Sequence, residues 1–239
     1  PVVEAGQTVK KGTLIAKAGQ GLSAPVFSSV AGTVKGVVSH ITLAGKKRDH
    51  ILIENDFSEE EERLPALSSF DRESVLGRIA EAGVVGMGGA AFPTNVKLDT
   101  SKLEEKPDTL IVNGSECEPY LTSDHRIMVE NAEQIVDGIV LAMKASGVSC
   151  AKVGIEDNKP DAIAAMREAA SDKQNVEVVS LPARYPQGFE KTLIYSLTGR
   201  IVPNGKLPSA AKCVVMNVGT CAALSAAVRK GQPLIDRVV

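Results

Sequence analysis

The feature that most limits how this chain can fold is a change of hydrophobic pattern near residue 59. Before it, segments such as 8–16 and 24–34 alternate apolar and polar residues between glycines, which is typical of short β-strands joined by tight turns. The acidic run 59–62 and Pro65 then predict a solvated connection. Beyond Asp71 helical and strand signals alternate. The sequence therefore predicts a small β unit followed by a larger α/β unit.

Caps and periodicity predict the elements of the α/β unit. Asp71 is expected to cap a helix that runs to Ala82 and ends at Gly83. Further helices are expected over residues 124–146, 160–171, 188–197 and 221–230. Strands are expected over residues 109–113, 151–155, 176–181 and 213–217. This alternation is typical of a layered α/β fold with a substantial core.

Composition argues against several classes of protein. The chain has 27 Lys and Arg against 29 Asp and Glu, so it lacks the excess of positive charge expected for binding nucleic acid. No apolar run reaches the roughly 18 residues of a membrane span, so no transmembrane segment is expected. The N-terminus lacks the pattern of a secretion signal, and its start without methionine suggests a fragment.

The four cysteines do not form a recognisable framework. They are too scattered for a set of disulfides and lack the C-x-x-C spacing of metal or cluster sites, so no metal site is predicted. Cys213 and Cys221 stand in apolar stretches and are expected in the core as reduced thiols. Cys117 stands between Glu116 and Glu118, whose charges disfavour a reactive thiolate.

A glycine-rich loop between Gly83 and Thr94 is the clearest sign of a ligand site. Its glycines permit close approach of an anion to the backbone amides, and Lys97 adds a positive charge. A plain connection between elements is the alternative. Gly86, Gly88 and Ala91 also satisfy the G-x-G-x-x-A pattern, but a classical dinucleotide fold requires a strand before the glycines, and a helix is expected there.

Four motifs follow one another in order. They span residues 86–97, 113–126, 185–191 and 217–220. Together they resemble the flavin-binding fold in the flavoprotein subunit of respiratory complex I, and more closely the C subunits of Rnf ferredoxin:NAD oxidoreductases. The resemblance implies a Rossmann-like, FMN-binding α/β domain over residues 70–233 after a linker at 57–69. Residues 1–56 resemble the small all-β barrel-sandwich domain, related in form to biotinyl and lipoyl carriers, that precedes this fold.

The resemblance also implies roles for individual residues. FMN would be bound by Gly86, Gly88, Gly89, Lys97, Asn113, Ser115, Glu116, Asn217 and Thr220. NADH would contact Phe92, Gly188 and Glu190, and the acids Glu116 and Glu190 would be catalytic beside the flavin and nicotinamide. Strand ends can present polar groups to a flavin edge, and aromatic rings stack on planar cofactors. The alternatives place Asn113 at a simple strand end, Glu190 on a solvated helix face and Phe92 in the core.

Some positions depart from the complex I pattern. That pattern has arginine at Met87, aspartate at Ser115, glutamate at Phe189 and asparagine at Met216, so the dinucleotide contacts are less well supported than the flavin contacts. Ala91 stands where glycine is usual and adds a Cβ to the loop, which is tolerated if φ there is negative.

The function implied by the resemblance is electron entry into a membrane-associated Rnf complex, by hydride exchange between NAD(H) and FMN. Two [4Fe-4S] clusters would lie in a missing region that begins with a β-grasp segment at 234–239, and ferredoxin would be reached indirectly, through them and other Rnf subunits. The complex implies a peripheral location at the cytoplasmic face of the cell membrane.

Two other functions remain open, a flavin-dependent cobalamin reductase of similar fold and a non-catalytic assembly module that has lost the flavin. A carrier role for the N-terminal domain would require a lysine at a hairpin tip. Gly21 stands there and Lys17 falls earlier, so a docking or structural role is expected.

Overall fold

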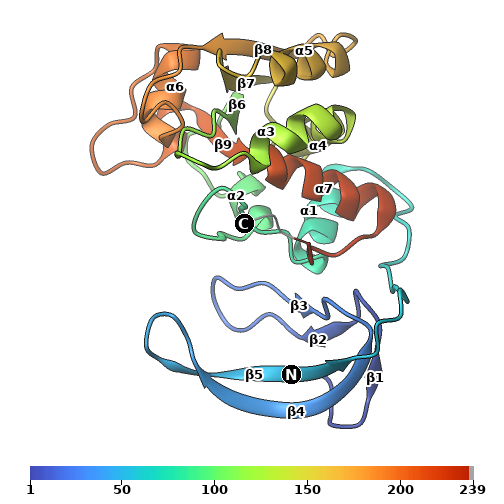
Figure 1. The fold of residues 1–239 in the computed structure, drawn as a ribbon. Coiled ribbons are helices and arrows are strands. Elements are labelled where there is room, and N and C mark those ends of the chain that lie inside the picture. The colour runs from blue at the N-terminus through green and yellow to red at the C-terminus, as the bar shows by residue number, and fades with distance from the viewer. Residues whose placement is uncertain (237–239) are drawn as a thin grey trace.

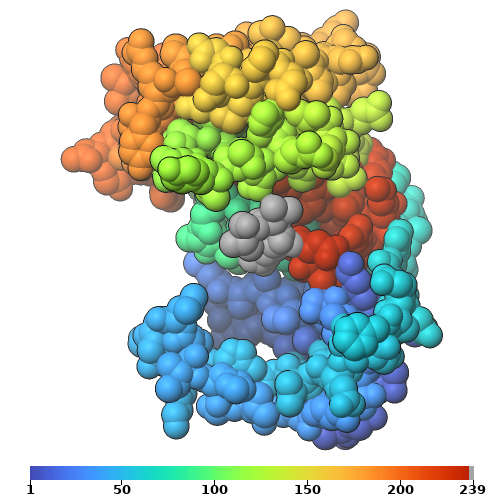
Figure 2. Space-filling model, viewed as in Figure 1, coloured from blue at the N-terminus to red at the C-terminus, as the bar shows by residue number. Residues whose placement is uncertain are grey.

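The computed structural model describes residues 1–236, in which a β region precedes an α/β region (Figure 1). In the β region, β1 (Thr8–Val9), β4 (Gly32–Ile41) and β5 (Lys47–Asn55) form one antiparallel sheet, and β2 (Leu14–Ala16) pairs with β3 (Val26–Phe27). A small core of Val9, Ile15 and Val34 joins them. The predicted strands are confirmed, and β1 to β3 are short as expected, but β4 and β5 are longer than predicted. Figure 2 shows the β4–β5 hairpin projecting from the body of the molecule.

The connection between the two regions is exposed, as its acidic run predicts, but its backbone is hydrogen-bonded. The N–H of Lys11 donates to the carbonyl of Glu60 at 3.0 Å, and the N–H of Glu62 donates to the carbonyl of Lys11 at 2.7 Å. Further along, the N–H of Leu64 donates to the carbonyl of Gly231 at 2.8 Å. The connection is therefore attached to both regions.

The sheet of the α/β region contains four parallel strands. They are β6 (Thr109–Gly114), β7 (Cys150–Glu156), β8 (Val176–Leu181) and β9 (Cys213–Asn217), in the spatial order β8-β7-β6-β9. The chain moves outward from β6 to β8 and then returns to place β9 on the other side of β6. The strand order therefore reverses between β6 and β9, and open α/β sheets bind ligands outside the carboxyl ends of the strands at such a point.

The helices are α1 (Arg72–Glu81), α2 (Thr94–Leu98), α3 (Ser123–Glu130), α4 (Ala132–Ser146), α5 (Pro160–Ala169), α6 (Glu190–Thr198) and α7 (Val218–Lys230). The predicted Asp71 cap of α1 is confirmed, since its side chain accepts the N–H of Ser74 at 2.8 Å. The prediction of one helix over 124–146 is wrong, because Asn131 has a non-helical backbone and separates α3 from α4. The helix predicted from Cys221 begins earlier, because Asn217 caps it.

Helices cover both faces of the parallel sheet. Leu110 and Val112 of β6 join the larger core beneath α1, α3, α4, α5 and α7, whereas Ile111 joins a second core beneath α6. Alternate side chains of a strand point to opposite faces, so a strand buried on both faces is apolar throughout. Cys213 and Cys221 are 1% and 0% exposed, which confirms them as core residues. Within residues 1–236, every helix is too short or too polar to cross a membrane.

Candidate functional site

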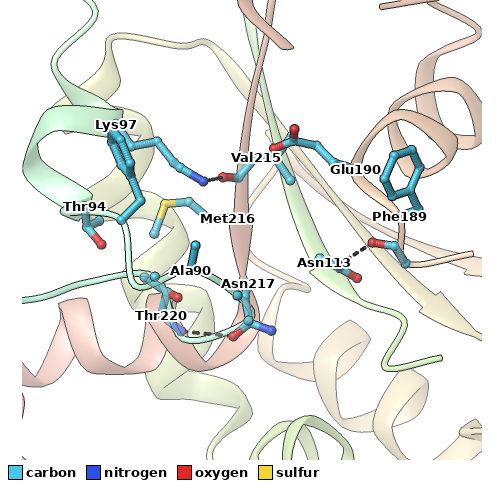
Figure 3. Close-up of a pocket in the computed structure, with 15 residues that line it drawn as sticks. Ala90, Thr94, Lys97, Asn113, Phe189, Glu190, Val215, Met216, Asn217 and Thr220 are labelled. Atoms are coloured by element: carbon cyan, nitrogen blue, oxygen red, sulfur yellow. Dashed lines mark hydrogen bonds between the residues drawn. The ribbon is translucent and has the colours of Figure 1, made fainter. Parts of the chain in front are cut away.

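A cavity of about 340 Å³ opens where the sheet reverses, at the carboxyl ends of β6 and β9 (Figure 3). Many predicted site residues line it: Gly86, Gly88, Gly89, Phe92, Lys97, Asn113, Gly188, Glu190, Asn217 and Thr220. Its volume lies within the roughly 300–1,000 Å³ usual for small-molecule sites. The fold thus gathers residues from four distant motifs around one space.

One wall of the cavity is built from the end of β9, the start of α7 and the glycine loop. The Oδ1 atom of Asn217 accepts the N–H groups of Gly219 and Thr220 at 2.8 and 3.3 Å, which caps α7. Its Nδ2 donates to Asp124 at 2.6 Å. Thr220 Oγ1 in turn accepts the N–H of Met87 at 3.0 Å, which holds the glycine loop against the helix.

Close packing explains a glycine at position 88 better than backbone freedom does. A Cβ added to Gly88 would lie 3.0 Å from side-chain atoms of Asn217, although φ at Gly88 lies outside the left-handed region. Ala91 does adopt a left-handed backbone, with φ of +53°. The negative φ that would accommodate its Cβ is therefore absent. We expect backbone strain of about 1–2 kcal/mol at Ala91.

The same wall carries groups suited to an anion. Lys97 extends from α2 and donates to the carbonyl of Val215 at 3.1 Å, and an ammonium group has further N–H donors to offer (Figure 3). Within residues 1–236, the backbone N–H groups of Gly88, Gly89 and Ala90 form no hydrogen bond of ordinary geometry. Successive free amides beside a cation are a common cradle for phosphate and other anions.

The opposite wall joins the end of β6 to residues 188–190. Asn113 donates to the carbonyl of Gly188 at 2.9 Å and accepts the N–H of Ser115 at 3.0 Å. Glu190 begins α6 and lines the cavity. Phe189 on this wall and Phe92 at the end of the glycine loop also line the cavity, and these residues are 56% and 38% exposed. Exposed rings beside a carboxylate can pack against a planar ligand that also donates hydrogen bonds.

Two predicted site residues, Ser115 and Glu116, are not among the residues that line the cavity. The buried Ser115 hydroxyl donates to the carbonyl of Gly154 at 3.4 Å. The Glu116 carboxylate accepts the N–H groups of Asp124 and His125 at 2.6 and 2.9 Å, at the start of α3. Both support the loop behind the wall, and their contact with a cofactor stays a prediction.

Sequence reasoning did not select several residues that line or support the cavity. Val215 and Met216 line it, but apolar residues of a buried strand give the same sequence signal as core, and Thr94 lines it from the start of α2. Asp124 lies behind it. Burial, aided by the charge of Glu116, raises the pKa of the Asp124 carboxyl to about 6 against the lowering effect of the hydrogen bond from Asn217.

Comparison with known proteins agrees with this geometry. Residues 79–226 match the family described as the Nuo51 FMN-binding domain, and residues 1–58 match the RnfC barrel sandwich hybrid domain. The first match covers more than half of the chain. The chain therefore belongs to the family of Nuo51-type FMN-binding domains, in the combination with an N-terminal barrel sandwich that is found in RnfC proteins.

Individual relatives indicate the type of protein more closely than the family models do. The chain is 49% identical, over 100% of its length and 52% of the relative, to the C subunit of the proton-translocating ferredoxin:NAD(+) oxidoreductase complex of Clostridium ljungdahlii. It is 42% identical, over 99% of its length and 54% of the relative, to the C subunit of the Na(+)-translocating complex of Acetobacterium woodii. The chain thus spans about half the length of these curated relatives. The predicted resemblance to Rnf C subunits is confirmed.

A solved structure supports the fold class. A chain of the NAD+-reducing [NiFe]-hydrogenase in the air-oxidized state matches with a TM-score of 0.57 and 27% identity, covering 66% of this chain and 30% of that one. The predicted Rossmann-like α/β domain after a barrel sandwich is therefore confirmed.

Proposed function

We propose that this chain binds FMN in the cavity between β6 and β9 and exchanges a hydride between NAD(H) and that flavin. One observation carries the proposal. Lys97 and residues 88–90, whose amides make no hydrogen bond in the described part of the chain, line one cavity at the switch point of a domain that belongs to an FMN-binding family. A phosphate ester with a planar ring system fits such a site, because the cradle takes the anion and the cavity takes the ring.

The residues present fit FMN in shape and in charge. Glycine at 88 lets the loop pack closely against Asn217, and the Lys97 ammonium can neutralise a phosphate group. When bound, FMN supplies a site that accepts or returns a hydride. The contribution of the chain is to hold the flavin, to orient it and to exclude water from one side of it.

NADH is proposed to enter at the opposite wall. Phe189 on this wall and Phe92, which faces the cavity from the end of the glycine loop, offer exposed apolar surface for a nicotinamide or adenine ring. The Glu190 carboxylate offers an acceptor for amide or hydroxyl groups. The proposed residues for this step are Phe92, Gly188 and Glu190. Glu116 would act from behind the wall through the start of α3.

The relatives support a role in a larger assembly, since they are named as subunits of ion-translocating ferredoxin:NAD+ oxidoreductase complexes. We extend this to the chain, with other Rnf subunits as partners at the cytoplasmic face of the cell membrane. Ferredoxin would be reached through two [4Fe-4S] clusters bound by residues outside this sequence. The domain limits 1–56, 57–69 and 70–233 belong to the same proposal. Of the β-grasp start proposed at 234–239, residues 237–239 lie outside the described residues.

Titration with FMN tests the flavin site directly. The unmodified chain should quench flavin fluorescence saturably at or below tens of micromolar, the order of −6 to −7 kcal/mol of binding free energy. Lys97→Ala should weaken binding about tenfold, whereas Lys102→Ala, which removes an exposed lysine outside the cavity, should leave it unchanged. Absence of quenching by the unmodified chain would remove the basis of the proposal.

The hydride step has its own test. Anaerobic NADH should bleach the oxidised flavin band of the FMN-loaded chain, and Glu190→Gln should slow the bleaching while FMN affinity changes little. A flavin that binds but is never bleached would exclude hydride exchange by this chain. That result would instead favour the cobalamin reductase or assembly alternatives.

A further inference from the structure

Asp124 lies behind the cavity and does not line it. It is in the first turn of α3, and its Oδ2 accepts Asn217 Nδ2 at 2.6 Å, a short bond that links α3 to the end of β9. The other end of the same carboxamide caps α7 through the N–H groups of Gly219 and Thr220. Asn217 thus lies between a carboxylate on one side and two backbone donors on the other.

The orientation of a carboxamide is not fixed by its shape, because its oxygen and nitrogen ends are nearly the same size. An ionised carboxylate only accepts hydrogen bonds and the backbone N–H groups of α7 only donate them, so both select the orientation in which Asn217 presents Nδ2 to Asp124 and Oδ1 to α7. A neutral group at position 124 that can both donate and accept would allow the reversed orientation. That orientation would place an NH₂ group against the N–H of Gly219.

We propose that ionised Asp124 is a positioning residue that sets the orientation of Asn217 and, through it, the shape of the flavin wall. The inference rests on the proposed function, which assigns that wall to FMN. Two contacts transmit the effect. Gly88 packs against the Asn217 side chain, and Thr220, which Asn217 caps, accepts the N–H of Met87 in the glycine loop.

The surroundings of Asp124 oppose its ionisation. Burial, aided by the charge of Glu116, raises its pKa to about 6, while the hydrogen bond from Asn217 and the charge of Lys159 lower it. The next residue of α3, His125, is paired with Asp161 of α5 at 2.7 Å. A carboxylate kept where ionisation costs stability is more typical of a functional site than of a structural one.

Two substitutions separate orientation from simple support. At pH 8, Asp124→Asn keeps an acceptor but loses the charge, so that only the N–H groups of Gly219 and Thr220 still select the orientation, and it should weaken FMN binding about three- to fivefold. Asp124→Ala removes the acceptor and should weaken binding about tenfold, on the order of one lost hydrogen bond to a charged group. Glu133→Gln, an exposed acid on α4, is the matched control and should bind as the unmodified chain does.

A pH profile adds a second readout. As pH falls from 8 to 5, the unmodified chain should lose its advantage over Asp124→Asn, because protonated Asp124 can also donate. The flavin phosphate and the neighbouring groups His125, Glu116 and Lys159 are the same in both proteins, so the ratio of the two dissociation constants reports the difference at position 124. A ratio that stays at one from pH 8 to pH 5 would overturn the inference.

Amide exchange without flavin keeps this test separate from the proposed function. Asp124→Ala should speed exchange at Gly219 and Thr220 while the sheet amides of Val112 and Val153 remain protected. Faster exchange throughout the sheet would indicate a general loss of stability and would overturn a positioning role. If the unmodified chain fails to bind FMN, the proposed function fails, and the exchange result still decides whether Asp124 orients Asn217.

Discussion

The two walls of the cavity use the same side chain in different electrostatic settings. Asn113 and Asn217 are register partners at the ends of β6 and β9, and each carboxamide bridges a strand end to another segment (Figure 3). Asn113 bonds to the neutral backbone groups of Gly188 and Ser115. Asn217 bonds to the half-buried carboxylate of Asp124 and to a helix N-terminus. The β9 wall therefore depends on charge, whereas the β6 wall depends on neutral hydrogen bonds.

The largest contrast is expected when each asparagine is replaced by aspartate. Asn217→Asp would place two carboxylates at the 2.6 Å contact with Asp124 and should lower the free energy of unfolding at pH 8 by about 3 kcal/mol. Asn113→Asp would place a carboxylate oxygen against the carbonyl oxygen of Gly188, where Asn113 now donates a hydrogen bond, and should lower the free energy of unfolding by about 1–2 kcal/mol. Urea unfolding of both variants at pH 8 and pH 5 measures the difference.

The pH dependence gives this comparison its sharpest form. The cost of Asn217→Asp should shrink at pH 5, where one of the two acids is protonated, and the cost of Asn113→Asp should change less. Equal costs for the two variants at both pH values would show that the walls do not differ in their dependence on charge.

Replacing Asp124 with a neutral residue should have the next largest effect on the free energy of unfolding, and this effect should stabilise the protein. The folded pKa of about 6 lies above the unfolded value of about 4, so the folded state binds this proton more tightly. Stability from this group is fully present below about pH 4 and is lost as pH rises to 6. Asp124→Asn avoids the loss and should gain about 2 kcal/mol at pH 8 but almost nothing at pH 4.

The melting temperature at these two pH values tests the sign. An Asp124→Asn variant that melts lower than the unmodified chain at pH 8 would contradict a carboxylate held against its environment. Together with the weaker FMN binding inferred above, the expected result is a variant that is more stable and binds less well. A purely structural residue would move both properties in the same direction.

Replacing a glycine of each wall with alanine should give a smaller contrast, which is measured in FMN affinity. A Cβ on Gly88 would lie 3.0 Å from Asn217, whose side chain is held by three hydrogen bonds, so Gly88→Ala should weaken FMN binding about tenfold. A Cβ on Gly188 would lie 3.3 Å from Cys117 Sγ, and the corresponding alanine should cost less than about threefold. Fluorescence titration ranks them, and the reverse order would contradict the tighter packing assigned to the β9 wall.

Sequence reasoning predicted the strands of the sheet and most of its helices, because apolar strands buried on both faces and helix caps leave strong local signals. It misjudged the break at Asn131, which separates two helices that have the same periodicity. The resemblance brought Lys97, Asn113 and Asn217 to one site. Asp124 lies within the motif at 113–126, but its role could not be predicted from the sequence, because it depends on a contact with Asn217 across 93 positions of the chain.

Ala91 offers the smallest and most local test of the β9 wall, because it lies in the left-handed region within the glycine loop. Replacing it with glycine should relieve about 1–2 kcal/mol of backbone strain, but glycine also gives the unfolded chain more freedom, at a cost of about 0.4–1 kcal/mol. The net change in the free energy of unfolding should therefore be a gain below about 1 kcal/mol. If the left-handed backbone is needed most when FMN is bound, glycine should also favour the bound loop, and FMN affinity should rise by less than fivefold. A loss of stability with Ala91→Gly would show that the left-handed conformation imposes no strain, and that the alanine Cβ has a packing role in the loop.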